Sequence, residues 1–433
     1  MAKENIRAIS YEALYEILER GEYSHLVIRA VLDKYAYLEK RDRAFFTRLT
    51  EGTIERCVEL DYLIEQVSAT KVKKMKPQIR TIIRMGAYQL KYMDAVPDSA
   101  ACNEAVKLAK KKGFASLSGF VNGVLRNLAR KMENLKYPSD EMEELSVRAS
   151  MPLWLVEHFV KSYGMEKTKD ILHCFLAEQP TSIRVNIRKI DRKTLLERLA
   201  DRGILCEPSS MLEEAAYLSS YDRLSDLDEF AKGLFSVQDI SSMMVGEWIN
   251  AKPGERILDV CAAPGGKALH AYERMGGSGQ VIARDLTSDK VDMILENAKR
   301  LGADHLTCEI WDATVFDSKL SGKMDAVIAD LPCSGLGIIG KKTDIKYKIT
   351  KEQLDELSEL QKVILKNAAG YVKPGGRLVF STCTMNPGEN EENVRWFEEQ
   401  FPEFSFVKKE QVFPKKGISD GFFISLFIKK ERA

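Results

Sequence analysis

Two cysteines end segments that are typical of buried strands, and each could do chemistry through its thiol. Cys333 comes three residues after Asp330 in ADLPCSGLG, and Cys383 lies in STCTMNPGENEENV. If the two strands are neighbours, both thiols project at the same edge of one sheet. Two thiols in one pocket indicate nucleophilic catalysis or a redox couple. The alternative is that each is an ordinary buried cysteine.

A turn of small residues follows an earlier strand and precedes a helix. Its two glycines let the backbone approach a ligand closely, next to a helix N-terminus. The turn lacks the three-glycine GxGxxG spacing of nicotinamide and flavin sites, which disfavours those cofactors. The candidate cofactor-binding residues of this turn are Cys261, Ala262, Ala263, Pro264, Gly265, Gly266 and Lys267.

Two aspartates end the next two predicted strands. Asp285 lies about 20 residues beyond the turn, where a carboxylate can accept hydrogen bonds from ribose hydroxyls. Asp312 ends the strand after it. Each aspartate alone could be an ordinary capping residue, because Asp is common where strands give way to turns. Together with the turn, they favour a cofactor that contains adenosine.

The composition excludes several other classes of protein. The eight cysteines form no CxxC pair or zinc-finger spacing, so we expect no metal site, no disulfide framework and a reducing, cytoplasmic location. The N-terminus, MAKENIRAIS, lacks the apolar core of a secretion signal. No apolar run reaches the roughly 18 residues of a membrane span.

The C-terminal residues 236–433 must position these groups, and their pattern alternates strands with helices. This alternation predicts a doubly wound α/β sheet of the Rossmann-like kind, in which ligands bind at the carboxyl ends of the strands. The candidate strands are 255–262, 279–286, 306–313, 324–331 and 377–384, with a closing strand at 422–430.

Residues 1–138 are predicted to form an all-helical, basic domain. Apolar residues recur there every three to four positions, the period of helices that bury one stripe. Residues 71–136 hold 15 basic and 4 acidic side chains. Such a positive block attracts polyanions, although lysine-rich helices also simply face water.

Residues 139–235 predict a small α+β linking domain. TSIRVNIRK (181–189) is typical of a strand, followed by a short helix and two further strands. Arg184, Arg188 and Lys189 either contact RNA or are exposed strand charges without a partner.

Two resemblances extend these expectations. The first lies in three segments of the N-terminal part, RAFFTRLTEGTIERCVELDYLIEQV (43–67), 83–113 and GFVNGVLRNL (119–128). These segments resemble the RNA-binding NusB family, which implies a helical RNA-binding domain. AAPGGK, ADLPCSGLG and STCTMNPGENEENV occur in the order and spacing of the RNA 5-methylcytosine methyltransferases, which use S-adenosylmethionine. The second resemblance covers about 236–433.

The methyltransferase resemblance assigns a role to each matching residue. Cys383 matches the nucleophile, Cys333 the cysteine needed for product release, and Asp330 a group that contacts both cofactor and target base. It implies that Cys261–Lys267, Asp285, Asp312 and Asp330 bind S-adenosylmethionine. With the NusB-like domain in front, it implies methylation of ring carbon 5 of a cytosine in 16S (small-subunit) rRNA. We expect the protein to be a monomer.

Two other functions compete with this interpretation. A non-catalytic RNA-binding assembly factor would also explain the basic helical domain, but it has no need of two thiols at strand ends. A redox enzyme could use the same thiols with a dinucleotide, but the three-glycine turn is absent. Measured binding of S-adenosylmethionine would favour a methyltransferase over both the assembly factor and the redox enzyme.

Overall fold

The computed structural model describes residues 4–431, and their contacts divide them into two compact units. Unit 1 holds the described chain up to Leu176 together with a short segment, Lys341–Lys348. Unit 2 holds Ala177–Gly340 and the chain from Ile349 onward. None of the helices in residues 4–431 combines the length and apolar composition needed to cross a membrane.

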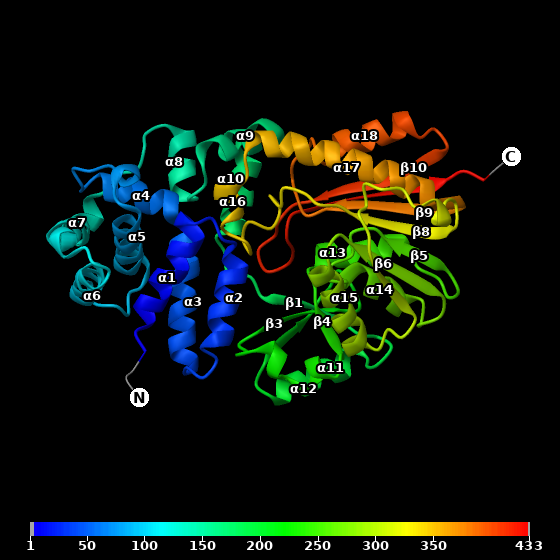
Figure 1. The fold of residues 1–433 in the computed structure, drawn as a ribbon, viewed down its shortest axis with the longest axis horizontal. Helices are drawn as coiled ribbons and strands as arrows, with labels where there is room; N and C mark the ends of the chain where they lie inside the picture. The colour runs from blue at the N-terminus through cyan, green and yellow to red at the C-terminus, as the bar shows by residue number, and fades with distance from the viewer. Residues whose placement is uncertain (1–3, 432–433) are drawn as a thin grey trace. The chain divides into compact units, whose positions relative to one another are not determined.

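Unit 1 is helical, which confirms the helical prediction for the N-terminal part of the chain (Figure 1). Three helices beyond residue 138 also group with this unit, as does a one-turn helix of the 341–348 segment. The helices are α1 Ile6–Glu19, α2 Ser24–Lys34, α3 Lys40–Glu55, α4 Cys57–Glu65, α5 Pro77–Tyr92, α6 Asp98–Lys111, α7 Ser118–Lys131, α8 Glu141–Arg148, α9 Leu153–Tyr163, α10 Met165–Phe175 and α16 Ile345–Lys348.

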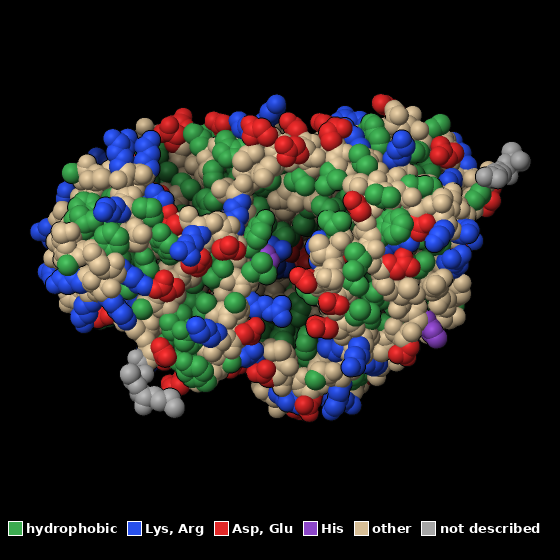
Figure 2. Space-filling model, viewed as in Figure 1, with side chains coloured by type: hydrophobic (Ala, Val, Ile, Leu, Met, Phe, Trp, Pro, Cys, Tyr) green, Lys and Arg blue, Asp and Glu red, His purple; other side chains and the backbone are tan. Residues whose placement is uncertain are grey.

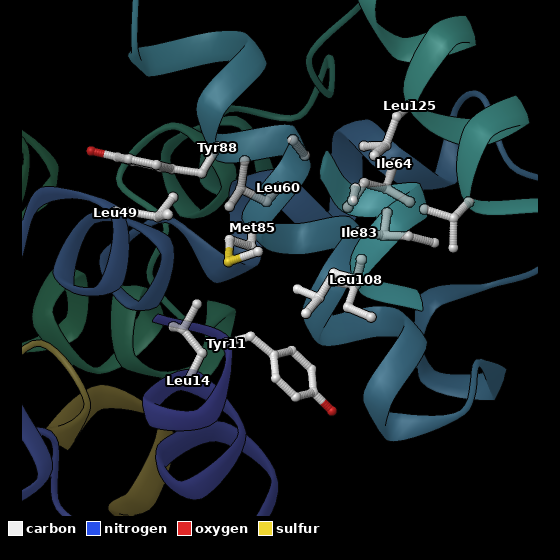
Figure 3. Packing of buried hydrophobic residues seen from close by; sticks show 14 of the residues in the cluster. Tyr11, Leu14, Leu49, Leu60, Ile64, Ile83, Met85, Tyr88, Leu108 and Leu125 are labelled. Carbon is white, nitrogen blue, oxygen red and sulfur yellow. The ribbon is translucent and has the colours of Figure 1, made fainter. Parts of the chain in front are cut away.

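The helices α1 to α7 pack around one apolar core, to which each contributes apolar residues (Figure 3). Leu14, Leu49 and Ile83 are fully buried in it. Gly86 on α5 lets Leu125 on α7 come close, because a Cβ at this glycine would lie 2.7 Å from the leucine Cδ1. Burial of apolar stripes is the main source of helix stability in such a bundle.

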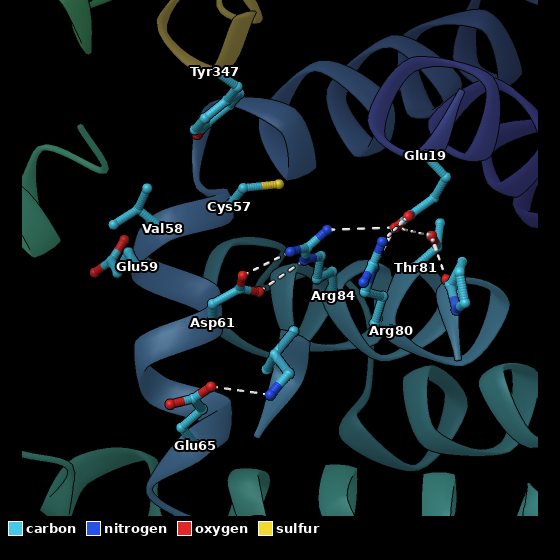
Figure 4. Close-up of polar contacts among 12 residues, drawn as sticks. Glu19, Cys57, Val58, Glu59, Asp61, Glu65, Arg80, Thr81, Arg84 and Tyr347 are labelled. Atoms are coloured by element: carbon cyan, nitrogen blue, oxygen red, sulfur yellow. Dashed lines mark hydrogen bonds and ion pairs between the residues drawn. The ribbon is translucent and has the colours of Figure 1, made fainter. Parts of the chain in front are cut away.

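Some of the basic residues of unit 1 are used inside the unit. Arg84 donates two hydrogen bonds to Asp61, at 2.7 and 2.6 Å, and Arg80 is paired with Glu19 (Figure 4). These pairs tie α5 to α4 and α1. Both arginines belong to the basic stretch 71–136, so part of its charge serves the fold and is not available to a ligand.

Most of the other basic residues of that stretch face outward. Figure 2 shows Lys and Arg side chains gathered over the end of unit 1 that carries α6 and α7. This exposed basic surface is a suitable place for a phosphate backbone. Its exposed side chains include Lys71, Lys73, Lys74, Lys76, Lys107, Lys110, Lys111, Arg126, Arg130 and Lys131.

The 341–348 segment is bound to the ends of two unit 1 helices. Asp344 accepts hydrogen bonds from the backbone N–H and hydroxyl of Ser24 (3.0 and 2.5 Å), and so caps the start of α2. Lys346 is buried, and its Nζ donates to the carbonyl of Glu55 at the end of α3 (2.7 Å). The chain directly after the Cys333 loop is therefore part of the helical unit, which the sequence pattern does not indicate.

Unit 2 contains a small antiparallel sheet with the strand order β2-β3-β1-β4. Its order of elements, strand, helix, strand, strand, agrees with the prediction for residues 181–220, and a short fourth strand is added. The elements are β1 Thr181–Val185, α11 Arg192–Asp201, β2 Leu205–Pro208, β3 Ala215–Ser219, α12 Asp228–Ala231 and β4 Phe235–Val237.

The larger sheet of unit 2 has the strand order β10-β11-β9-β8-β5-β6-β7. The strands β9, β8, β5, β6 and β7 are parallel, while β11 and β10 are added antiparallel. The elements are α13 Ile240–Ile249, β5 Arg256–Asp259, α14 Gly266–Arg274, β6 Gln280–Asp285, α15 Ser288–Leu301, β7 Leu306–Ile310, β8 Met324–Asp330, α17 Lys351–Tyr371, β9 Val372–Thr382, α18 Glu391–Gln400, β10 Phe404–Val412 and β11 Phe422–Lys429.

Helices cover both faces of this sheet, as the alternation of strands and helices predicts (Figure 1). Successive strand residues point to opposite faces, so Ile257 packs with α13, α14 and α15 while Leu258 packs with α17 and α18. Each of the six predicted strands is present. β10 is an additional edge strand, and its polar sequence, FSFVKKEQV, carries no signal of burial.

Candidate active site

The turn Cys261–Lys267 joins the end of β5 to the start of α14. The backbone N–H of Ala263 donates to the Asp285 carboxylate at 2.9 Å, so the turn is tied to the end of β6. Gly265 has a φ of +102°, and a Cβ there would lie 3.0 Å from Leu269 Cδ1. The backbone conformation favours glycine at this position, and a Cβ would also crowd the leucine side chain.

Asp330, at the end of β8, is held from two sides. Lys267 Nζ lies 2.7 Å from one carboxylate oxygen, and the Ser381 hydroxyl donates to the other at 2.7 Å. Burial opposes the charge on Lys267, but the nearby acidic groups, Asp330 foremost, together outweigh it and raise the pKa of this ammonium group overall. Lys267 thus joins the glycine turn to a carboxylate at the end of a neighbouring strand.

Asp259, the last residue of β5, is a buried carboxyl group that the sequence pattern does not single out. Burial, and then the nearby charge of Asp330, raise the pKa of Asp259 to about 8. Its Oδ2 atom has no hydrogen-bond partner among the described residues. The only sign of a functional role for Asp259 in the sequence is its position at the end of an apolar strand, just before the glycine turn. This sign is weak.

The two thiols lie side by side. Cys333 Sγ is 3.2 Å from Cys383 Sγ. Their strands are paired, since β8 runs parallel to β9 with Asp330 opposite Ser381. The hydrogen bond to the neighbouring thiol, followed by burial, raises the pKa of Cys333 well above its usual value. Cys333 is therefore a neutral thiol near pH 7.

The two other predicted aspartates lie in different surroundings. Asp285 is buried, and besides holding Ala263 it forms an ion pair with Lys290 at 2.9 Å. Asp312 is exposed, and it accepts hydrogen bonds from the backbone N–H and hydroxyl of Thr314 (2.9 and 2.7 Å). This turn lowers the pKa of Asp312 and is the local capping role that the sequence offered as the alternative.

Arg184 is neither an RNA contact nor an exposed charge without a partner, so both alternatives for it are wrong. Its guanidinium is fully buried, pairs with Glu273 at 3.0 Å, and donates to the carbonyl of Gly266 at 2.8 Å. The small sheet thus holds the glycine turn in place. Arg188 and Lys189 are exposed but donate to backbone carbonyls at the C-terminal end of α15 (3.0 and 3.1 Å).

Comparison with known proteins covers nearly the whole chain. Residues 4–130 match the NusB family, 151–223 the RsmF/B-like ferredoxin-like domain, and 246–428 the family described as 16S rRNA methyltransferase RsmB/F. The probable ribosomal RNA small subunit methyltransferase B of Bacillus subtilis is 35% identical over 99% of this chain and 100% of its own length.

The chain belongs to the ribosomal RNA small subunit methyltransferase B family. A member from Vibrio cholerae is 30% identical over 98% of both chains. The crystal structure of PH0851 has the same fold, with a TM-score of 0.85, 24% identity and 99% coverage of both chains. As a member of this family, the protein is an S-adenosylmethionine-dependent rRNA methyltransferase.

The residues at the strand ends fit the family's cofactor. S-adenosylmethionine carries a sulfonium and an ammonium cation, which suit carboxylates, and a carboxylate, which suits a helix N-terminus. Asp259 offers a buried oxygen that has no hydrogen-bond partner within residues 4–431, and α14 begins directly at the turn. Among residues 4–431, no cluster of three or more His, Cys, Asp or Glu side chains is placed to hold a metal ion.

Proposed function

We propose that this enzyme methylates ring carbon 5 of a specific cytosine in 16S rRNA through a transient covalent bond between Cys383 and the base. The observation that carries the proposal is the pair of thiols, 3.2 Å apart at the ends of two adjacent strands. The carboxyl group of Asp330 ends one of these strands. An enzyme that methylates an oxygen or an exocyclic nitrogen has no need of paired thiols here.

The reaction requires a nucleophile because ring carbon 5 of cytosine is too weakly nucleophilic to take a methyl group directly. Addition of the Cys383 thiolate to ring carbon 6 moves electron density onto carbon 5, which then takes the methyl group. Bound S-adenosylmethionine supplies that methyl group on its sulfonium. A base must next remove the proton from carbon 5, so that the bond to Cys383 can break.

Two other residues complete the proposed site. Asp330 would contact the ring nitrogen and exocyclic amine and stabilise the charge that develops during addition. Cys333 would assist release of the product, through the step in which the proton leaves carbon 5.

The target cytosine has to leave its stack to reach this site, so we expect a flipped or single-stranded base. The exposed basic side chains of the NusB-like domain, residues 1–138, would hold the surrounding phosphates. The linking domain, 139–235, would support the catalytic domain, 236–433. We propose that the enzyme acts in the cytoplasm as a monomer.

The proposal is tested by incubating the protein with methyl-labelled S-adenosylmethionine and deproteinised 16S rRNA, followed by digestion to nucleosides. We expect the label in 5-methylcytidine. Large-subunit rRNA serves as the control and should take up no label. Label in any other nucleoside, or none with intact protein and RNA, contradicts the proposal. RNA binding without cofactor binding would instead support a non-catalytic assembly factor.

Asp285→Ala is expected to weaken binding of S-adenosylmethionine by about 10- to 100-fold, the usual effect of losing a charged hydrogen-bond partner. The change removes the acceptor of the Ala263 N–H and the proposed acceptor for the ribose hydroxyls. Calorimetric titration of both proteins measures the effect. Asp289→Ala, on the exposed face of α15, is the matched control. Equal affinities for wild type and Asp285→Ala would remove this residue from the cofactor site.

A further inference from the structure

Glu389 is a fully buried carboxylate in the loop between β9 and α18, and the proposed mechanism does not use it. It accepts four hydrogen bonds. Ser334 donates twice, through its backbone N–H (2.9 Å) and its hydroxyl (2.5 Å). The side-chain amides of Gln361 and Asn386 donate the others, at 2.9 and 3.1 Å.

The origin of these donors shows what the carboxylate holds together. Ser334 follows Cys333 directly, in the loop after β8. Gln361 lies on α17 and also donates to the carbonyl of Pro332, the residue before that cysteine, at 2.8 Å. Three of the four hydrogen bonds therefore come from outside the loop of Glu389, so the carboxylate does more than close its own turn.

The other thiol is connected to the same group. Thr384 follows Cys383 directly, and its hydroxyl lies 2.7 Å from the hydroxyl of Ser334. The residues after the two cysteines are thus hydrogen-bonded to each other directly, and Glu389 holds one of them, Ser334, through two further hydrogen bonds.

From these contacts, and resting on the proposed function, we infer that Glu389 is a positioning residue for the catalytic thiols. It fixes the loop of Cys333 against the loop of Cys383, so that both sulfur atoms face one target base. Burial raises the pKa of Glu389, while its four donors stabilise the carboxylate form. The negative charge of Glu389 also contributes to the raised pKa of Cys333.

Glu389→Gln tests this role because it keeps the size of the side chain and changes one acceptor into a donor. Since all four partners donate, at least one of them would then face another donor. A misplacement of reacting groups by about 1 Å can cost about 100-fold in rate. We therefore expect kcat to fall by about that factor, with the KM for RNA and the Kd for S-adenosylmethionine within about twofold of wild type.

A second readout needs neither RNA nor methyl transfer. Diamide oxidises two adjacent thiols to a disulfide, taking up both thiol hydrogens as its azo group becomes a hydrazine. In wild type, Cys333 and Cys383 should form this bond rapidly, and loss of free thiol measures the rate. We expect the rate to fall about tenfold in Glu389→Gln. Glu392→Gln, an exposed change on the first turn of α18, is the matched control.

The possible outcomes separate this inference from the proposed function. Disulfide formation and kcat within about threefold of wild type in Glu389→Gln would overturn the positioning role. If wild type fails to make 5-methylcytidine, the proposed function fails, but the disulfide rates still decide whether Glu389 positions the thiols. If Glu389→Gln does not fold, Ser334→Ala removes one link with less disturbance, and unchanged rates in it would equally overturn the inference.

Discussion

Cys383→Ser is expected to abolish methyl transfer, with kcat lowered by about 10⁴-fold or more. A serine hydroxyl is far less acidic than a thiol and provides almost no anion near pH 7, so addition to ring carbon 6 cannot start. The side chains are close in size, and Cys383 is only half-buried, so the fold should persist. The measurement is incorporation of labelled methyl groups under single-turnover conditions, with RNA and cofactor binding measured in parallel.

Cys308→Ser provides the matched control for the loss of a thiol. Cys308 is another half-buried cysteine of the same sheet, on β7, and lies in neither of the loops that carry the paired thiols. This variant should retain full activity. If Cys383→Ser retains turnover above about a hundredth of wild type, Cys383 is not the nucleophile, and the covalent mechanism then has to be assigned to Cys333 or given up.

Cys333→Ala is expected to leave RNA covalently attached to the enzyme. Cys383 can still add to the base and carbon 5 can still take the methyl group, but release of the product is slowed. Because general acid–base groups contribute at least about 100-fold, turnover should fall by about that factor while the first methyl transfer persists. A denaturing gel should show a protein–RNA adduct approaching one RNA per enzyme.

The double variant Cys333→Ala with Cys383→Ser controls for nonspecific attachment and should give no adduct. An adduct that forms in the double variant would not involve Cys383. Complete methylation by Cys333→Ala without any adduct would show that product release does not depend on the second thiol. The division of labour between the two cysteines would then be wrong, even if Cys383 remains the nucleophile.

The architecture could be predicted because local patterns report it. The alternation of strands and helices predicts the doubly wound sheet, and the three-to-four-residue period predicts the helical unit. The edge strand β10 was missed for the same reason, since the polar sequence FSFVKKEQV lacks the pattern of a buried strand. The 341–348 segment was also missed, because its burial depends on helices some three hundred residues away in the chain.

Single charged residues were predicted less well. Arg184 was a candidate for RNA contact, but it is buried against Glu273 and the glycine turn. The sequence does not show that Arg184 is buried and paired. The local pattern around an arginine in a strand is the same whether its partner is a phosphate or a distant carboxylate. Asp312, a predicted cofactor-binding residue, lies on the surface and caps its own turn. Asp259, which was not among the predicted site residues, is buried beside the glycine turn.

The sequence by itself determined the type of chemistry, because motif order and spacing place particular residue types at the ends of neighbouring strands. It determined the family for the same reason. Only the tertiary structure decided how those groups meet: a separation of 3.2 Å between two sulfur atoms, the pairing of Lys267 with Asp330, and the hydrogen bonds that join Glu389, in the loop of Cys383, to Ser334, in the loop of Cys333. Distances, burial and charge pairing depend on residues that are far apart in the chain, and no local pattern records them.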